Sequence, residues 1–250
     1  MISVKALGTN GWFDSDTGQT MCTLIQSEDF DIILDAGFGI RKIKGLVDVS
    51  RPIYLFLSHL HYDHTVGLHT LEIYHFEKPL TVIVPEGQKD AFLRMGNAPY
   101  SSDWTRCLPA GIRIFESNEI DTIGLPFKVE ALPLRHTVPD VGFRFEIDGK
   151  VIAYLTDTGY CDNAVTLAKN ADLAIAECGA LPGTAKPNWP HMEPAIDAKL
   201  AVEANVKLML LTHFGAGDYT SLKMRYDAVK SARNIFPYLI TGVDDLEVAI

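Results

Sequence analysis

Cysteine is scarce in this 250-residue sequence and never occurs as a CxxC pair. We therefore expect neither a disulfide framework nor a cysteine-ligated zinc site from the four scattered residues Cys22, Cys107, Cys161 and Cys178. No run approaches the roughly 18 apolar residues of a membrane span. The first residues also lack the basic flank and long apolar core of a secretion signal. These absences predict a protein of the reducing cytoplasm with no membrane partner.

Basic residues are also in the minority, with 22 Lys and Arg against 32 Asp and Glu, a formal net charge of −10. A chain of this charge repels polyanions and offers no broad basic surface to a long nucleic acid. A small anionic substrate is compatible with it only if the pocket supplies positive charge of its own.

Short apolar runs between turn residues are typical of strands interleaved with helices, an α/β pattern. We predict strands at Ser3–Leu7, Met21–Gln26, Ile32–Asp35, Ile53–Leu57, Leu80–Val84, Ile112–Phe115, Phe127–Leu134, Gly142–Ile147, Val151–Leu155, Leu173–Ala176 and Leu208–Leu211. We predict helices at Gly87–Arg94, Asn163–Lys169, Pro194–Ala204 and near Ser221–Ala232. Asp148-Gly149 signals a hairpin turn. No linker divides the chain, so we predict one domain over residues 1–250, with the structureless stretch 96–111 as a candidate lid.

Five of the apolar runs end in a side chain that can bind a metal or carry an acid. Because functional residues in sheet-based folds gather beyond the carboxyl ends of strands, this repetition predicts one shared edge. The five side chains are His59, His136, Asp157, Glu177 and His213.

The densest cluster is the segment from Ser58 to His64, which holds three histidines and an aspartate. On extended chain His59 and His61 point the same way and could grip one ion. Asp63 and His64 follow on a turn, displaced enough to hold a second ion. Imidazole and carboxylate are ligands expected of zinc, with manganese or iron as alternatives.

Other residues have plainer interpretations. The isolated His69 and His75 sit at no strand end, so we interpret them as ordinary surface or core residues. The opening loop carries Trp12 and Phe13, which either line a pocket and stack on a ring or simply cover the core.

The segment His59-Leu60-His61-Tyr62-Asp63-His64 matches the HxHxDH signature of the metallo-β-lactamase superfamily. The resemblance runs from Gly8-Thr9-Asn10-Gly11 through Asp35-Ala36-Gly37 to Leu211-Thr212-His213-Phe214. It implies a four-layer αββα sandwich with two mixed sheets, two divalent metal ions, and frequent dimers, hence a homodimer here. In the family's pattern the first ion is held by His59, His61 and His136, the second by Asp63, His64 and His213, and both by Asp157.

Within that superfamily, Thr156-Asp157-Thr158-Gly159 and the later motifs resemble the ribonuclease Z and cyclic-phosphodiesterase branch. The resemblance implies that His191 contacts phosphate or protonates the leaving oxygen, aided by Glu177. Ribonuclease Z enzymes carry a long tRNA-gripping arm in the interval that matches His136 to Asp157. Here one predicted hairpin, Gly142–Leu155, fills that interval, so tRNA is not the expected substrate.

We therefore expect a dinuclear metal-dependent phosphodiesterase for a small phosphodiester or cyclic nucleotide-like substrate. Two divalent cations outweigh Asp63, Asp157 and a hydroxide, so the site would favour an anionic ester over a neutral lactam or lactone. Asp63 would orient or deprotonate the attacking water, and His191 with Glu177 would protonate the leaving group. A lactone or thioester hydrolase, an iron-dependent oxidoreductase resembling persulfide dioxygenases, and a non-catalytic metal scaffold stay open as alternatives.

Overall fold

The computed structural model describes residues 1–250, except for the side chains of Thr105 and Cys107. A seven-stranded sheet has the order β15 (Glu247–Ala249), β1 (Ser3–Gly8), β3 (Cys22–Gln26), β4 (Asp31–Leu34), β5 (Ile53–Phe56), β6 (Leu80–Val84) and β7 (Ile112–Glu116). A six-stranded sheet has the order β14 (Leu239–Thr241), β12 (Met209–Thr212), β11 (Leu173–Glu177), β10 (Lys150–Leu155), β9 (Val141–Ile147) and β8 (Lys128–Pro133). Both sheets are mixed, and β2 (Asn10–Gly11) pairs in parallel with β13 (Phe214–Gly215).

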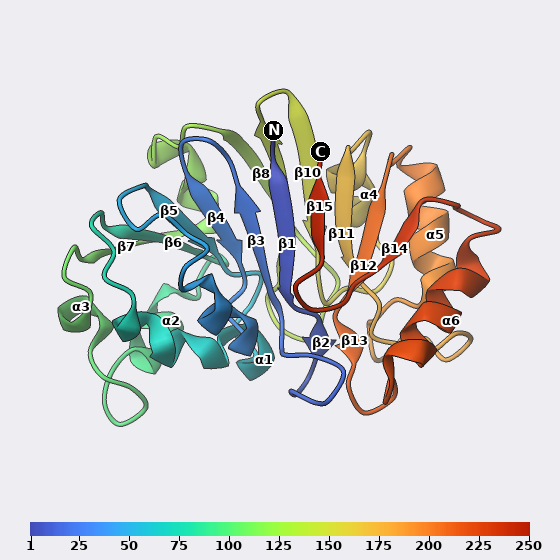
Figure 1. Ribbon diagram of the computed structural model, residues 1–250, viewed down its shortest axis with the longest axis horizontal. Coiled ribbons are helices and arrows are strands. Elements are labelled where there is room, and N and C mark those ends of the chain that lie inside the picture. The colour runs from blue at the N-terminus through green and yellow to red at the C-terminus, as the bar shows by residue number, and fades with distance from the viewer.

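Helices flank the two sheets on their outer sides (Figure 1). Beside the first sheet lie η1 (Phe38–Ile43), α1 (Tyr62–Thr65), η2 (Val66–Ile73), α2 (Lys89–Met95) and α3 (Trp104–Cys107), and η3 (Ser117–Thr122) follows β7. Beside the second sheet lie α4 (Asp162–Ala168), α5 (Pro194–Glu203) and α6 (Leu222–Ala232). The predicted αββα sandwich is confirmed.

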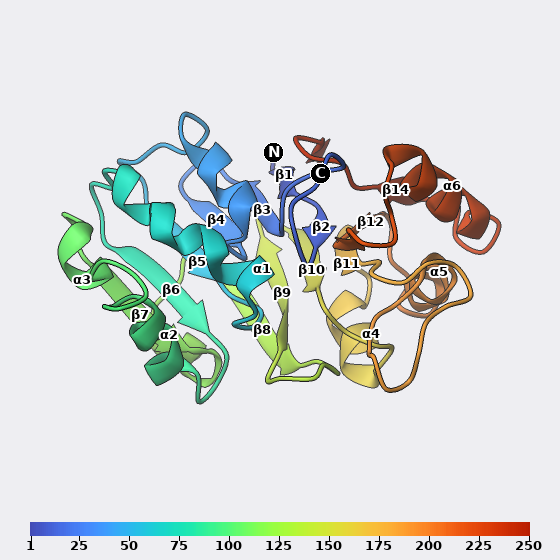
Figure 2. The same ribbon diagram turned by 90° about the horizontal axis from the view of Figure 1, so that it is seen from below.

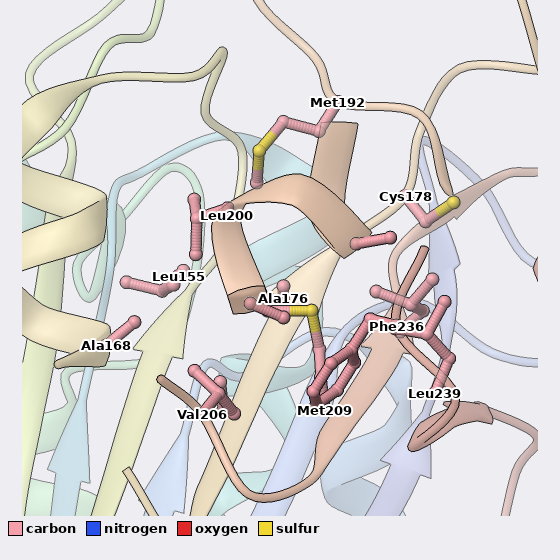
Figure 3. Packing of buried hydrophobic residues seen from close by; sticks show 14 of the residues in the cluster. Leu155, Ala168, Ala176, Cys178, Met192, Leu200, Val206, Met209, Phe236 and Leu239 are labelled. Carbon is pink, nitrogen blue, oxygen red and sulfur yellow. The ribbon is translucent and has the colours of Figure 1, made fainter. Parts of the chain in front are cut away.

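Three apolar clusters fill the spaces between these layers, and strand alternation explains them. In β10, Ile152 and Tyr154 face the other sheet, while Ala153 and Leu155 face the helices. Such a two-residue period is what a strand buried on both faces requires. Figure 3 shows the helix-side cluster, where Leu155 and Met209 from the sheet pack near Leu200 from α5.

The predicted hairpin joins β9 to β10 at Asp148-Gly149. Both turn residues have positive φ, 48° and 75°, as the tight turns that suit twisted strands require. The pair of strands occupies most of the interval between His136 and Asp157, as predicted from the sequence.

The remaining differences from the sequence prediction concern short elements. The prediction that 96–111 is structureless is wrong, because the stretch contains α3 and buries Trp104 against Phe92, with ring centroids 5.3 Å apart. Figure 1 shows α3 at the outer end of the molecule, far from α1, so its position does not favour a lid. The short strands β2, β13, β14 and β15 were not predicted.

Cys22, Cys161 and Cys178 are free thiols, as the sequence indicates, while the side chain of Cys107 lies outside the described residues. Within the described chain, no helix has the length and apolar character needed to cross a bilayer.

Candidate metal centre

The strand ends of the second sheet meet at one edge of the molecule. Strands β10, β11 and β12 are parallel, and β8 runs in their direction because it is antiparallel to β9. His136, Asp157, Glu177 and His213 therefore emerge together, confirming the predicted shared edge. In Figure 2 this edge faces the viewer, with α1 and β2 beside each other near the middle.

The chain turns sharply at three strand ends, one in the first sheet and two in the second. Asp35, Asp157 and His213 have φ of 57°, 55° and 50°, in the left-handed region that non-glycine residues rarely occupy. Backbone strain of this kind persists where the surrounding structure imposes it, and it clusters at functional sites. All three side chains are buried at the same edge.

The first candidate ligand group comprises His59, His61, His136 and Asp157, whose ligand atoms all lie within 4.8 Å of one another. His59 Nε2 lies 2.9 Å from His61 Nδ1, and His136 Nε2 lies 3.3 Å from the same atom. Asp157 Oδ2 completes the group, 3.7 Å from His59 Nε2. Three imidazole nitrogens and one carboxylate oxygen thus face a common point.

The second candidate ligand group comprises Asp63, His64, Asp157 and His213, also within 4.8 Å. His213 Nε2 lies 2.9 Å from Asp157 Oδ1 and 3.3 Å from Asp63 Oδ2. His64 Nε2 lies 3.3 Å from Asp157 Oδ1. Asp157 therefore turns one oxygen to each group. Asp63 and His64 lie on the single helical turn α1, rather than on a non-helical turn.

The residues of both groups fit a pair of divalent cations. Neutral imidazole and carboxylate oxygen are the ligand types that zinc takes in hydrolytic sites. The buried Nε2 of His64 finds no hydrogen-bond partner in the described part of the chain, although carboxylates of Asp63 and Asp157 lie 3.6 and 3.3 Å away. A cation between these groups would use that nitrogen. The structure brings all seven side chains together, and their role as metal ligands stays a prediction.

Two buried acidic side chains lie behind the histidines, and one of them is hydrogen-bonded to a candidate ligand. Asp35 Oδ2 accepts hydrogen bonds from Tyr154 Oη and from His64 Nδ1, both at 2.7 Å. Asp140 Oδ1 lies 3.3 Å from His59 Nδ1, but the Asp140 oxygens make no hydrogen bond within the described chain, and Ser58 Oγ lies closer to that nitrogen, at 3.0 Å. Carboxylates behind metal-binding histidines fix the ring orientation and leave the other nitrogen for the metal. Sequence reasoning missed Asp140, and it noticed Asp35 only within the family resemblance, although Asp35 directly follows an apolar run.

The two groups differ in charge when no cation is present. Burial lowers the pKa of His136 to about 4, and burial together with the nearby His64 lowers the pKa of His59. Burial also disfavours the charged form of His213, but Asp157 and Asp63 outweigh it and raise the pKa of His213 to about 10. Asp157 and Asp35 likewise raise the pKa of His64. The protonated imidazoles of His64 and His213 therefore balance the negative charge of the carboxylates in the second group.

The opening loop reaches the second group through its backbone. The Trp12 N–H donates to Asp63 Oδ2 at 2.7 Å. Gly11 packs so closely on His213 that a Cβ at position 11 would lie 2.4 Å from the imidazole Cε1. Only glycine, which has no Cβ, avoids this clash. The side chains of Trp12 and Phe13 are 76% and 44% exposed. Their stacking on a substrate ring stays a prediction.

A buried arginine holds this loop in place. Arg225 of α6 donates to Thr9 Oγ1 at 2.9 Å, to Thr17 Oγ1 at 2.8 Å and to Asn10 Oδ1. Its guanidinium also lies over the Phe214 ring, 4.8 Å from the centroid. These contacts join the first residues of the chain to the last helix. The sequence showed no signal for them, because a lone arginine in an amphipathic helix suggests a solvated face.

His191 and Glu177 form a pair beside the second group. His191 Nδ1 lies 2.9 Å from Oε1 of the fully buried Glu177, which also accepts a hydrogen bond from the Met192 N–H. The ring of His191 stacks on His213, with centroids 5.7 Å apart and planes 13° apart. Burial disfavours its charged form, but the Glu177 carboxylate raises the pKa of His191. By contrast, His69 and His75 are exposed and belong to neither ligand group.

Comparison with known proteins identifies the family. The sequence profile described as "Beta-lactamase superfamily domain" matches residues 31–214. This chain belongs to that family. The metallo-β-lactamase resemblance seen in the sequence is thus confirmed, and the chain is a metallo-hydrolase of the metallo-β-lactamase fold.

Individual members of the superfamily support the same fold. Probable metallo-hydrolase YhfI of Bacillus subtilis is 26% identical over 224 residues, covering 87% of this chain and 90% of the relative. The crystal structure of YhfI superposes with a TM-score of 0.79 at 21% identity over the full length of both chains. Human tRNase Z, short form, gives 0.74 at 22% identity over 99% of each chain. A diphosphatase from the PhnP family gives 0.74 at 14% identity, over 100% of this chain and 98% of that one.

Proposed function

We propose that this metallo-hydrolase is a dinuclear phosphodiesterase that cleaves a small phosphodiester or a cyclic nucleotide-like substrate. The observation that carries the proposal is the pair of His191 and Glu177, placed directly against His213 of the second ligand group. Cleavage of a phosphodiester leaves an alkoxide that needs a proton, and this pair is built to deliver one. A lactone or thioester hydrolase would use the same ligand groups but has less use for His191.

The seven ligand side chains would hold two divalent cations, with Asp157 between them. Such cations lower the pKa of a bound water toward about 7 and stabilise charge on phosphate oxygens. Zinc fits the donor set best, and manganese and iron are the alternatives to test. The cations also bring the positive charge that the rest of this acidic chain lacks, which favours an anionic substrate.

Asp63 is the group in this site that can orient the attacking water or accept its proton. Its Oδ2 is held by the Trp12 N–H and faces His213, so the carboxylate has a fixed direction. The attack would proceed from the space between the two ligand groups.

His191 would act as the general acid that protonates the leaving oxygen. Glu177 holds Nδ1, so the proton for the leaving oxygen comes from Nε2. The negative Glu177 raises the pKa of His191 and so favours the protonated ring that an acid requires.

The comparisons lend support through proteins that act at phosphorus. A ribonuclease Z of Metallosphaera sedula is 24% identical over 290 residues, covering 95% of each chain, and the PhnP-family protein is named a diphosphatase. The net charge of −10 and the short β9–β10 hairpin argue against tRNA as the substrate of this chain. A cytoplasmic location and a homodimer stay predictions.

Elemental analysis of protein purified without added metal, followed by an assay with bis(p-nitrophenyl) phosphate, tests the proposal. We expect two zinc or manganese ions per chain and release of p-nitrophenol. His191→Ala should lower turnover by about 10² to 10⁴ with the metal content unchanged. His75→Ala, an exposed histidine outside both groups, is the matched control and should retain wild-type turnover.

Other outcomes contradict the proposal in different ways. One iron per chain with thiol-dependent oxygen consumption would identify the oxidoreductase alternative. Cleavage of lactones or thioesters without cleavage of phosphodiesters would point to the other hydrolase. Loss of metal in His191→Ala would mean that His191 is a ligand or a support for one.

A further inference from the structure

A cavity of about 530 Å³ lies beside the candidate metal centre, within the size range of small-molecule sites. One wall is formed by residues 180–190, here called the 180–190 loop, and Asp218, which follows β13, also contributes to the lining. His191 also lines the cavity. The metal centre and the cavity therefore share one side chain.

The 180–190 loop is braced at several points, so the cavity is preformed. The Ala180 N–H donates to the Met192 carbonyl at 3.0 Å, and Tyr219 Oη donates to the Ala180 carbonyl at 2.7 Å. Arg135, next to the candidate ligand His136, donates from Nη2 to the Pro187 carbonyl at 2.8 Å. A preformed pocket binds its ligand without the entropic cost of ordering a loop.

The lining combines one large aromatic surface with polar groups. Trp189 is 62% exposed although it is the largest side chain of the loop, and its ring centroid lies 5.7 Å from that of His191. The other side chains include Lys186, Asn188 and Thr184, which can hydrogen-bond to a ligand. An exposed indole beside such groups suits a planar ring with polar edges.

His191 lies between the candidate metal centre and this cavity, and this position fixes the orientation in which a substrate would bind. Its ring contacts His213 on one side, at 5.7 Å between centroids, and Trp189 on another, at the same separation. If His191 protonates the leaving oxygen, the alcohol that departs is the part of the substrate next to His191 and thus next to the cavity.

We infer that this cavity binds the leaving-alcohol half of the substrate and that Trp189 stacks on a planar ring carried by that alcohol. The orientation rests on the proposed function, whereas the ring-binding site itself does not. Trp189 is thereby a residue that determines specificity. The enzyme favours phosphodiesters whose leaving alcohol carries a nucleobase-like ring over those that release a small alkyl alcohol.

Intrinsic tryptophan fluorescence tests the ring site without any hydrolysis. The chain has three tryptophans, and Trp104 is buried while Trp12 and Trp189 are exposed. Zinc-loaded protein in phosphate-free buffer is titrated with uridine or adenosine, and with ribose as the matched probe that lacks a ring. The variants are Trp189→Leu and, as the control that keeps Trp189, Trp12→Phe. Thermal unfolding midpoints verify that both exposed positions tolerate the change.

We expect saturable quenching by a nucleoside in the wild type and in Trp12→Phe, no saturable quenching in Trp189→Leu, and none by ribose. In the same variants, KM for bis(p-nitrophenyl) phosphate should rise roughly tenfold in Trp189→Leu, the usual loss for one stacked ring, with kcat within about twofold of wild type.

The inference is overturned if quenching survives in Trp189→Leu, if it depends on Trp12 instead, or if neither nucleoside binds saturably. These results are separate from the proposed function. If the wild type cleaves no phosphodiester but binds uridine through Trp189, the proposed phosphodiesterase function is refuted and the ring-binding site is supported. Cleavage without any role for Trp189 would refute the ring site alone.

Discussion

The first ligand group, His59, His61 and His136, and the second, Asp63, His64 and His213, share Asp157 but are held differently. His59 and His61 come from one short segment, and burial keeps His59 and His136 neutral. The second group joins α1 to the end of β12 and depends on the opening loop, which packs Gly11 on His213 and donates the Trp12 N–H to Asp63. Its two imidazoles carry raised pKa values.

This difference in protonation indicates the order in which the two ligand groups would bind their cations. Neutral imidazoles can bind a cation at once, whereas protonated ones must first release their protons. We therefore expect the first group to bind its cation more tightly near neutral pH. The second group is the part of the site that mutations and acid disrupt first.

Removing the shared carboxylate should have the largest effect, because it is common to both groups. Asp157→Asn takes away the negative charge that offsets the repulsion between two cations. We expect zinc below two per chain by elemental analysis and turnover lower by about 10³ or more. Full retention of two ions would show that the groups do not depend on a shared ligand.

A change at Gly11 should separate the two halves. In Gly11→Ala the new Cβ would meet the imidazole of His213, so the second group loses its geometry while the first is untouched. We expect about one zinc per chain instead of two. The control is Gly217→Ala, where a Cβ would lie an ordinary 3.6 Å from Trp12. Equal loss of both ions in Gly11→Ala would contradict the separation.

The supporting carboxylates allow the same comparison with smaller effects. Asp35→Asn weakens the hydrogen bond to His64 Nδ1, and Asp140→Asn alters the side chain that lies 3.3 Å from His59 Nδ1. Substitutions behind metal ligands usually cost 10–100-fold in affinity. We expect calorimetric zinc titration to show the weaker binding step affected by Asp35→Asn and the tighter step by Asp140→Asn. If Asp35→Asn affected the tighter step and Asp140→Asn the weaker one, the second group would be the one that binds its cation first.

The mildest perturbation is a change of pH. The pKa of His213, raised to about 10, and the raised pKa of His64 mean that both imidazoles are protonated near pH 7. Binding to the second group therefore releases protons, and its apparent affinity rises with pH. Calorimetry in buffers of different ionisation enthalpy should count more protons released in the second step than in the first. Equal counts would argue against the difference in protonation.

The sequence predicted the parts of the site that follow from local pattern. The dense histidine segment, the shared sheet edge and the hairpin at Asp148-Gly149 follow from apolar runs, strand ends and turn chemistry, whereas the seven-residue ligand set is what the family resemblance implies. The strand β13 and the contact of Gly11 with His213 were not predictable, because they join segments about 200 residues apart. The contact of Trp12 with Asp63 is made by a backbone N–H, so it cannot be predicted from the residue type. Arg225 is likewise explained only by what surrounds it in the folded chain.

The most direct test of the central claim is a crystal structure of the zinc-loaded protein with anomalous diffraction measured across the zinc edge. The account predicts two anomalous peaks per chain, one bound by His59, His61 and His136 and one by Asp63, His64 and His213, with Asp157 contacting both. A single peak, or peaks bound by other residues, would contradict it.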